Sequence, residues 1–220
     1  MMGIKSGTFV ILASGRGSNF QAIIDQVSNG FIPATCSALI TDNPDSYVIE
    51  RARAAGVPVR VVPFRSFPGK EQYEAALIGE IQRYDPDLIV LAGYMRILGS
   101  SIVRRYAGRM INIHPSLLPS FPGLHAQDQA VRYGVKVAGC TVHFVTEDMD
   151  AGPVIIQRTV PVFAGDNGDT LAERILNEEH IAFPEAICLF FQGKLSINGR
   201  MVLIREGGDV IPTSENSGEV

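Results

Sequence analysis

Short, nearly continuous runs of apolar residues recur along the first half of the chain. Such runs are typical of strands that are covered on both faces, as in parallel sheets. The pattern therefore predicts buried strands at residues 9–13, 35–41, 57–62, 88–92 and 110–113.

Between these runs, apolar residues repeat with the period of an α-helix, which places them on one helical face. One stripe consists of Phe20, Ile23, Ile24 and Val27, and a second of Tyr73, Leu77, Ile81 and Tyr84. Alternating strands and helices predict a Rossmann-like, doubly wound α/β fold. In this fold a mostly parallel sheet carries helices on both faces, with right-handed crossovers.

The rhythm changes after about residue 135. Residues 137–145 and 154–162 are extended runs joined by an acidic loop, which predicts two further strands, added in antiparallel fashion. Residues 170–173, Thr-Leu-Ala-Glu, match a capping box and predict the start of a closing helix. Within that helix Pro184 is expected to start a new helix or to cause a kink. We expect residues 1–206 to form one domain and residues 207–220 to form a flexible tail.

Composition and charge narrow the functional classes. The chain has 220 residues, of which 46% are hydrophobic and 19% charged, as in ordinary globular proteins. A net charge of −4 provides no general basic field, so we expect no nucleic-acid partner. No apolar run is long enough to span a membrane, and residues 9–13 are too short for a signal-peptide core. We therefore expect a cytoplasmic protein without a membrane partner.

The three cysteines, Cys36, Cys140 and Cys188, are widely spaced and include no Cys-x-x-Cys pair. We expect reduced, buried thiols and no metal site.

A glycine-rich segment, residues 13–19 (Ala-Ser-Gly-Arg-Gly-Ser-Asn), follows the first strand and opens the first helix. Free amides at a helix N-terminus bind anions, so this loop predicts a phosphate site. Phe20 stands where a dinucleotide fingerprint needs a small residue, which argues against NAD. Ser18 and Asn19 are placed to donate to a monophosphate. The alternative is a structural turn in which one of them is the N-cap.

A second candidate is Asn112-Ile-His114 at the end of a strand, followed by a loop stiffened by three prolines. The period of a strand sends both polar side chains to the same face. Asn supplies an N–H donor and a protonated His supplies charge and a transferable proton, so together they can hold an oxyanion. The alternative is a buried histidine bonded to a loop carbonyl.

A third candidate lies in residues 142–153, where Glu147, Asp148 and Asp150 precede Ala-Gly-Pro. A carboxylate near His114 would favour the charged imidazolium. The alternative is an exposed acidic hairpin tip.

Five motifs together closely resemble the phosphoribosylglycinamide formyltransferases, the folate-dependent enzymes of purine synthesis. They are Gly15-Arg-Gly-Ser-Asn19, Leu91-Ala-Gly-Tyr-Met-Arg-Ile-Leu98, Asn112-Ile-His-Pro-Ser-Leu-Leu-Pro119, Phe121-Pro-Gly-Leu-His125 and Thr146-Glu-Asp-Met-Asp-Ala-Gly-Pro-Val-Ile155. The resemblance runs from about residue 8 to about residue 205. It implies the formyltransferase fold and transfer of a formyl group from 10-formyltetrahydrofolate to the amine of glycinamide ribonucleotide.

By this resemblance, Asn112, His114 and Asp150 form the catalytic trio. Asn112 and His114 hold the oxyanion of a tetrahedral intermediate, and Asp150 orients His114 and assists proton movement. The other implied contacts fall into three groups: Gly17, Ser18 and Asn19 at the phosphate, Glu179 at the glycinamide, and Lys70, Met95, Arg96, Ile97, Leu98 and Asn112 at the folate. Lys70 stands where the family often has arginine, which keeps the charge but loses the planar fork. The donor is a cosubstrate, and no metal is implied.

Three other functions compete with this reading. Formyltetrahydrofolate hydrolases share the Asn-x-His and Asp elements, but carry an N-terminal regulatory domain and a different residue after the histidine, here Pro115. Methionyl-tRNA formyltransferases add a C-terminal tRNA-binding domain. A non-catalytic nucleotide-binding domain would need neither Asn112 nor His114. The sequence leaves the oligomeric state open, a homodimer included, and favours packing roles for His125, His143 and His180.

Overall fold

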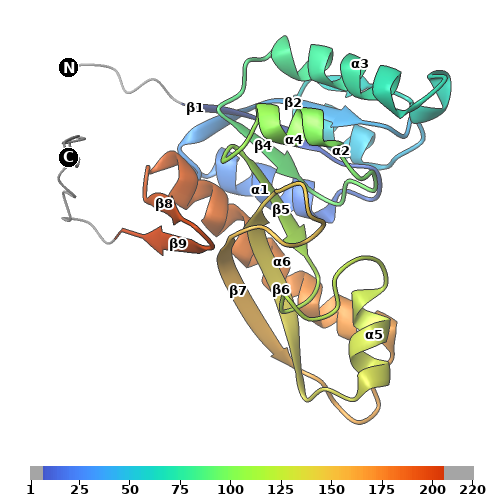
Figure 1. Ribbon diagram of the computed structural model, residues 1–220, viewed down its shortest axis with the longest axis vertical. Coiled ribbons are helices and arrows are strands. Elements are labelled where there is room, and N and C mark those ends of the chain that lie inside the picture. The colour runs from blue at the N-terminus through green and yellow to red at the C-terminus, as the bar shows by residue number, and fades with distance from the viewer. Residues whose placement is uncertain (1–6, 206–220) are drawn as a thin grey trace, which may run out of the picture.

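One mixed sheet organises the protein (Figure 1). The computed structural model describes residues 7–205. The strand order is β3-β2-β1-β4-β5-β6-β7-β9-β8. The strands are β1 (Gly7–Leu12), β2 (Ala34–Thr41), β3 (Val59–Val61), β4 (Leu88–Leu91), β5 (Met110–His114), β6 (Val137–Phe144), β7 (Val154–Pro161), β8 (Leu195–Asn198) and β9 (Met201–Ile204).

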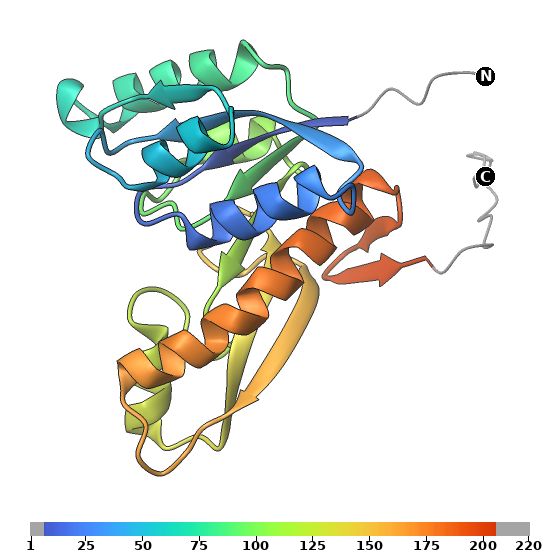
Figure 2. The ribbon, with the colours of Figure 1, turned by 180° about the vertical axis from the view of Figure 1, so that it is seen from behind.

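Helices cover both faces of this sheet, as predicted (Figures 1 and 2). One face carries α1 (Ser18–Ser28), α2 (Val48–Ala54), α5 (Ala126–Tyr133) and α6 (Gly168–Phe191), and the other carries α3 (Lys70–Gln82) and α4 (Ser100–Arg105), with a short 3₁₀ helix, η1 (Phe64–Ser66), before α3. Strand β1 shows why. Phe9 and Ile11 belong to one core and Val10 and Leu12 to the other, all fully buried. A central strand of this kind reads as a continuous apolar run because neither face meets water.

Parallel pairing joins β3, β2, β1, β4 and β5, and antiparallel pairing adds β6 and β7, as the sequence indicated. The register between β5 and β6 sets Asn112 opposite His143 and His114 opposite Thr141. This pairing brings polar residues of two strands to one place on the sheet.

The start of α6 differs from the prediction. The helix begins at Gly168, and Asn167 is the N-cap of a capping box whose third residue is Thr170. Asn167 Oδ1 accepts from the Thr170 N–H at 2.9 Å, and Thr170 Oγ1 accepts from the Asn167 N–H at 3.1 Å. The box predicted at residues 170–173 is therefore wrong by one turn, because Asn167 is itself a strong N-cap residue.

No new helix starts at Pro184, which lies buried inside α6. Its neighbours Phe183, Ala186 and Ile187 are fully buried in the core, so packing holds the helix across the missing N–H.

Two strands after α6 were not predicted. β8 and β9 form an antiparallel hairpin around Asn198-Gly199, and β9 joins the sheet beside β7. Asn-Gly between short apolar stretches is a hairpin signal that could have revealed them.

Several further expectations concern the whole chain. The three cysteines are free and buried, as predicted. Among the described residues, no helix combines the length and apolarity needed to cross a membrane. The predicted tail, residues 207–220, lies outside the described residues.

The cap of α6 gives a direct test of the helix start. Replacing Asn167 by Ala removes the acceptor for the Thr170 N–H and should lower the free energy of unfolding by about 1 kcal/mol, measured by urea denaturation. The control is Glu173→Ala. Glu173 is exposed and would matter only if the box began at Thr170. A larger loss from Glu173→Ala than from Asn167→Ala would contradict the observed cap.

Candidate active site

The predicted site residues collect where parallel strands end. The carboxyl ends of β1, β2, β4 and β5 meet at one edge of the sheet, and open α/β sheets bind ligands at such edges. The glycine loop follows β1, residues 93–98 follow β4, and Asn112 and His114 end β5.

His114 is 6% exposed and has an acceptor at each ring nitrogen. Its Nε2 lies 2.9 Å from the carbonyl oxygen of Phe121, and its Nδ1 lies 3.4 Å from Oδ2 of Asp150. Because a carbonyl can only accept, Nε2 donates to Phe121, whereas Asp150 lies near Nδ1 at a distance longer than a normal hydrogen bond. The loop-carbonyl contact expected as the alternative is therefore present together with the approach of Asp150.

Asp150 reaches His114 from the loop between β6 and β7. Its Oδ2 also accepts from the Gly123 N–H at 2.8 Å, which ties this loop to the proline-rich loop. Its side chain is 11% exposed. The structure thus places Asp150 beside His114, whereas Glu147 of the same acidic loop pairs with Arg104 of α4 at 2.7 Å. That pairing lowers the pKa of Glu147 to about 2.

His143 is part of the site, which the sequence reading did not favour. It is 2% exposed, its Nδ1 lies 2.9 Å from the Phe144 carbonyl, and its Nε2 lies 3.3 Å from Nδ2 of Asn112. Burial lowers the pKa of His143, although the Phe144 carbonyl and Asp150 oppose the shift. A neutral ring with its proton on Nδ1 leaves Nε2 as an acceptor, which fixes the orientation of the Asn112 amide.

The proline-rich loop is held against β6 by Thr141. The Thr141 hydroxyl donates to the Ser116 carbonyl at 2.6 Å and accepts from the Leu118 N–H at 3.0 Å. Thr141 is fully buried. This contact keeps the loop carbonyl of Phe121 in place beside His114.

The glycine loop turns into α1 at Gly17, which is the N-cap with φ of 73°. A Cβ at Gly17 would collide with Val48 of α2, so both the backbone and the packing require glycine. Ser18 and Asn19 are the first two residues of the helix, and neither is its cap. The backbone N–H groups of this first turn have no partners inside the helix and can meet an anion.

Asn19 and Glu179 link the glycine loop to α6. Nδ2 of Asn19 donates to Oε2 of Glu179 at 2.7 Å, and both side chains are buried. Burial raises the pKa of Glu179, opposed by the Asn19 hydrogen bond and by the charge of His114. The predicted residues Asn19, Glu179 and His114 are thus brought into one electrostatic neighbourhood.

Residues 95–98 form an open rim after β4. The side chains of Met95 and Ile97 are 67% and 69% exposed, and Leu98 is half-buried. Arg96 turns back to pair with Asp42 at 2.7 Å. Exposed apolar side chains on such a rim can cover a flat aromatic ligand.

Lys70 starts α3 and lies 3.7 Å from Glu74, whose carboxylate accepts from the Gly99 N–H. Lys70 is therefore connected to the end of the rim indirectly, by way of the Glu74 carboxylate.

Among the described residues, neither His125 nor His180 makes a hydrogen bond or ion pair with the trio. The side chain of His125 is 76% exposed and lies 3.8 Å from Asp128. Burial and the charge of Arg51 lower the pKa of His180.

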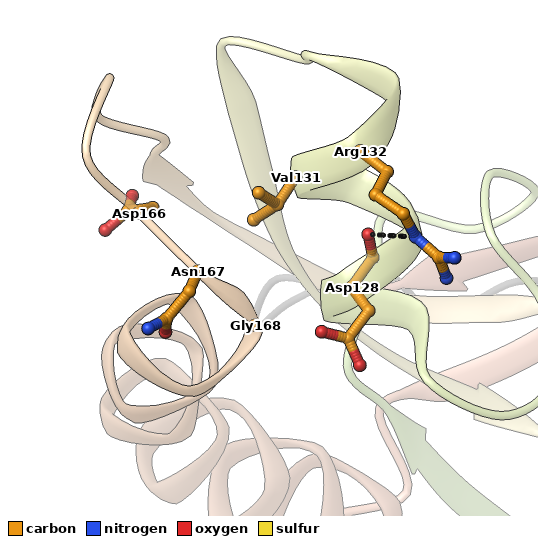
Figure 3. A pocket seen from close by; sticks show the side chains of 6 residues that line it. All are labelled: Asp128, Val131, Arg132, Asp166, Asn167 and Gly168. Carbon is orange, nitrogen blue, oxygen red and sulfur yellow. Dashed lines mark hydrogen bonds between the residues drawn. The ribbon is translucent and has the colours of Figure 1, made fainter.

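A pocket of about 450 Å³ lies between α5 and the start of α6 (Figure 3). Its lining consists of Asp128, Val131, Arg132, Asp166, Asn167 and Gly168. None of the predicted site residues lines it, so it is separate from the site described above. Across residues 7–205, no group of three or more His, Cys, Asp or Glu side chains has the arrangement of a metal site.

Comparisons with known proteins bear on this geometry. The family model described as "Formyl transferase" matches residues 8–187. Phosphoribosylglycinamide formyltransferase of Escherichia coli (strain K12) is 47% identical over 86% of this chain and 89% of that protein.

Solved structures agree with this match. Glycinamide ribonucleotide transformylase 1 from Symbiobacterium toebii has a TM-score of 0.89 and 48% identity, covering 91% of this chain and 94% of that one. A formyltetrahydrofolate deformylase from Pseudomonas syringae pv. tomato has a TM-score of 0.86 and 26% identity, covering 92% of this chain and 67% of that one.

The burial of Glu179 predicts a pH-dependent cost. Because the pKa of Glu179 is raised above its ordinary 4.5 in the folded protein, the unfolded chain loses this proton first as pH rises. The folded state therefore loses stability between the ordinary value and the raised one. The Glu179→Gln variant lacks this loss. The free energy of unfolding of the variant, minus that of wild type, should therefore increase as pH rises from 4 to 8.

Urea denaturation across that pH range measures the gain. Glu173→Gln is the control, since Glu173 is exposed on the same helix and should show no such trend. A difference between Glu179→Gln and wild type that stays constant with pH would contradict the burial argument.

Proposed function

The chain belongs to the formyl transferase family, and we propose that it transfers the formyl group of 10-formyltetrahydrofolate to the amine of glycinamide ribonucleotide. One observation carries this proposal. A glycine loop suited to phosphate and an Asn-His-Asp cluster suited to acyl transfer lie at the same sheet edge. The chain also matches phosphoribosylglycinamide formyltransferases over most of their length. The reaction places the protein in purine biosynthesis, and its location stays predicted as cytoplasmic.

The reaction begins when the lone pair of the substrate amine forms a bond to the formyl carbon. The π electrons of the carbonyl move to its oxygen and create an oxyanion. Asn112 can donate its second Nδ2 proton to that oxygen, since His143 engages only the first. His114 can donate from Nδ1, because 3.4 Å to Asp150 is longer than a normal hydrogen bond and leaves this proton the less engaged one.

Proton transfer completes the cycle. The attacking nitrogen becomes positive and must lose a proton, and the folate nitrogen must gain one as the carbon–nitrogen bond breaks. Asp150 lies beside His114 and can relay the proton through water. No metal is needed in any of these steps.

The ribonucleotide site combines the glycine loop with α6. The backbone N–H groups at Gly17, Ser18 and Asn19 and the Ser18 hydroxyl are proposed to hold the phosphate. The Asn19 side chain is already committed to Glu179, so its backbone is the better donor. Glu179 is proposed to accept from the glycinamide portion.

The donor site is proposed at the rim that follows β4. Met95, Arg96, Ile97 and Leu98 are proposed to hold the pterin ring, largely through their backbone, with Asn112 at the formyl group. Lys70 contributes positive charge at the far end of this rim.

A formyltetrahydrofolate hydrolase is the second candidate, because the deformylase shares the fold. Water would then replace the amine, and the phosphate site at the glycine loop would have no purpose.

An absorbance assay separates these functions. The donor, or its dideaza analogue, is incubated with the protein in the presence and absence of glycinamide ribonucleotide. The proposal expects deformylated folate only when the ribonucleotide is present. Release without it identifies a hydrolase, and no release in either case rejects both activities.

The oxyanion role of Asn112 predicts a large kinetic effect. Asn112→Ala should reduce turnover by about 10²–10³-fold while the protein stays folded, because one oxyanion donor is removed. Asn177→Ala is the matched control, since Asn177 is exposed on α6. Turnover of Asn112→Ala near that of wild type would refute the assignment.

A further inference from the structure

A buried carboxylate outside the predicted site connects three of its strand ends. Asp42 directly follows β2, and its side chain is 3% exposed. Its Oδ1 accepts from the Ser14 hydroxyl at 2.5 Å, and its Oδ2 accepts from Arg96 Nε at 2.7 Å. Both oxygens of a buried charge are thus satisfied, as burial requires.

Ser14 continues this connection to the backbone of the rim. The Met95 N–H donates to the Ser14 hydroxyl at 2.9 Å, and the Ser14 N–H donates to the Gly93 carbonyl at 3.1 Å. Ser14 is the second residue of the glycine-rich segment, residues 13–19. The end of β1 therefore anchors both the glycine loop and residues 93–95.

Arg96 is held on two sides. Its guanidinium stacks over the ring of Phe64 at 4.3 Å from the ring centre, and its Nε is bound to Asp42. The Arg96 side chain is 39% exposed, so it could otherwise turn into solvent. The carboxylate of Asp42 is what keeps Arg96, and with it the backbone of residues 95–98, turned toward the strand ends.

From these contacts we propose that Asp42 is a positioning residue for the formyl-donor site. Acting through Ser14 and Arg96, it fixes the backbone of residues 95–98 relative to the glycine loop. This inference rests on the proposed function only where it names the donor as the ligand of the rim. The positioning itself is a property of the protein without ligand.

A positioning role and a general structural role predict different kinetics. Loss of the Asp42 contacts should affect the rim that is tied to it. The turn into α1 has its own contacts: the Gly15 carbonyl accepts from the Val48 N–H at 3.1 Å, and the Arg16 carbonyl accepts from Arg51 Nε at 2.9 Å. Asp42→Ala should therefore raise the KM for 10-formyltetrahydrofolate about tenfold, the effect of losing a hydrogen bond to a charged group. The KM for the ribonucleotide and kcat should stay within about twofold of wild type, because Asp42 contacts neither the first turn of α1 nor the trio.

Hydrogen exchange tests the positioning without the reaction. In Asp42→Ala, the peptide that contains the Met95 amide should exchange faster than in wild type, whereas peptides of α1 should be unchanged. Ser14→Ala removes the acceptor of the Met95 N–H directly and should show the same two effects if Asp42→Ala does not fold. Asp42→Asn keeps an oxygen that accepts from Arg96 and an N–H that donates to Ser14. Its KM for 10-formyltetrahydrofolate should therefore be close to that of wild type.

Asp45→Ala is the matched control, because Asp45 is exposed in the same loop and should behave as wild type. The inference is overturned if Asp42→Ala and Ser14→Ala leave the donor KM and Met95 exchange unchanged, or if both substrate KM values rise together. If the wild-type protein transfers no formyl group, the proposed function is wrong. Faster exchange at Met95 in the variants would still support the positioning role of Asp42.

Discussion

Polar side chains buried at the strand ends must find their partners within the protein, and this constraint shapes the whole site. The set of such residues includes Ser14, Asn19, Asp42, His114, Thr141, His143 and Glu179, none more than 9% exposed. An unpaired buried polar group costs far more than a paired one gains. Each of these side chains makes at least one hydrogen bond within the protein, which restricts its orientation, although Oδ1 of Asn19 has no partner among the described residues.

The pairing also sets charge. His143 and His114 are both buried, yet their surroundings differ. His143 has the Phe144 carbonyl at Nδ1 and the Asn112 amide at Nε2, with Asp150 Oδ1 farther away at 3.9 Å, and burial lowers the pKa of this ring. His114 has the Phe121 carbonyl at Nε2, and Asp150 Oδ2 lies 3.4 Å from its Nδ1. Two histidines on facing strands thereby have different partners, and only His143 contacts the Asn112 amide. Because their surroundings differ, the two rings need not share one protonation state.

The sequence predicted those parts of the structure that depend on local pattern. Buried runs such as residues 9–13 and the stripe along α1 identified the α/β architecture, because a strand covered on both faces and an amphipathic helix have distinct periods. Asn112 and His114 were assigned to one face for the same reason. The start of α6 and the β8–β9 hairpin differ from the sequence prediction. Asn167 competes with a nearby capping pattern, and the strands on either side of Asn198-Gly199 have only four residues each.

The long-range contacts of the site could not be read from the sequence. The Asn19–Glu179 bond spans 160 positions, and the pairing of Asn112 with His143 depends on the register of β5 and β6. Spacing alone gave no reason to choose His143 over His125 or His180.

The central claim is that buried pairing fixes the Asn112 amide through a neutral His143. Nitrogen-15 NMR of the histidine rings in the full-length protein tests this claim most directly. The account predicts that His143 is neutral at pH 7 with its proton on Nδ1, and that its pKa lies below the ordinary 6.5. A His143 ring that is protonated on Nε2 at pH 7, or that carries both protons, could not accept from Asn112 and would contradict the account.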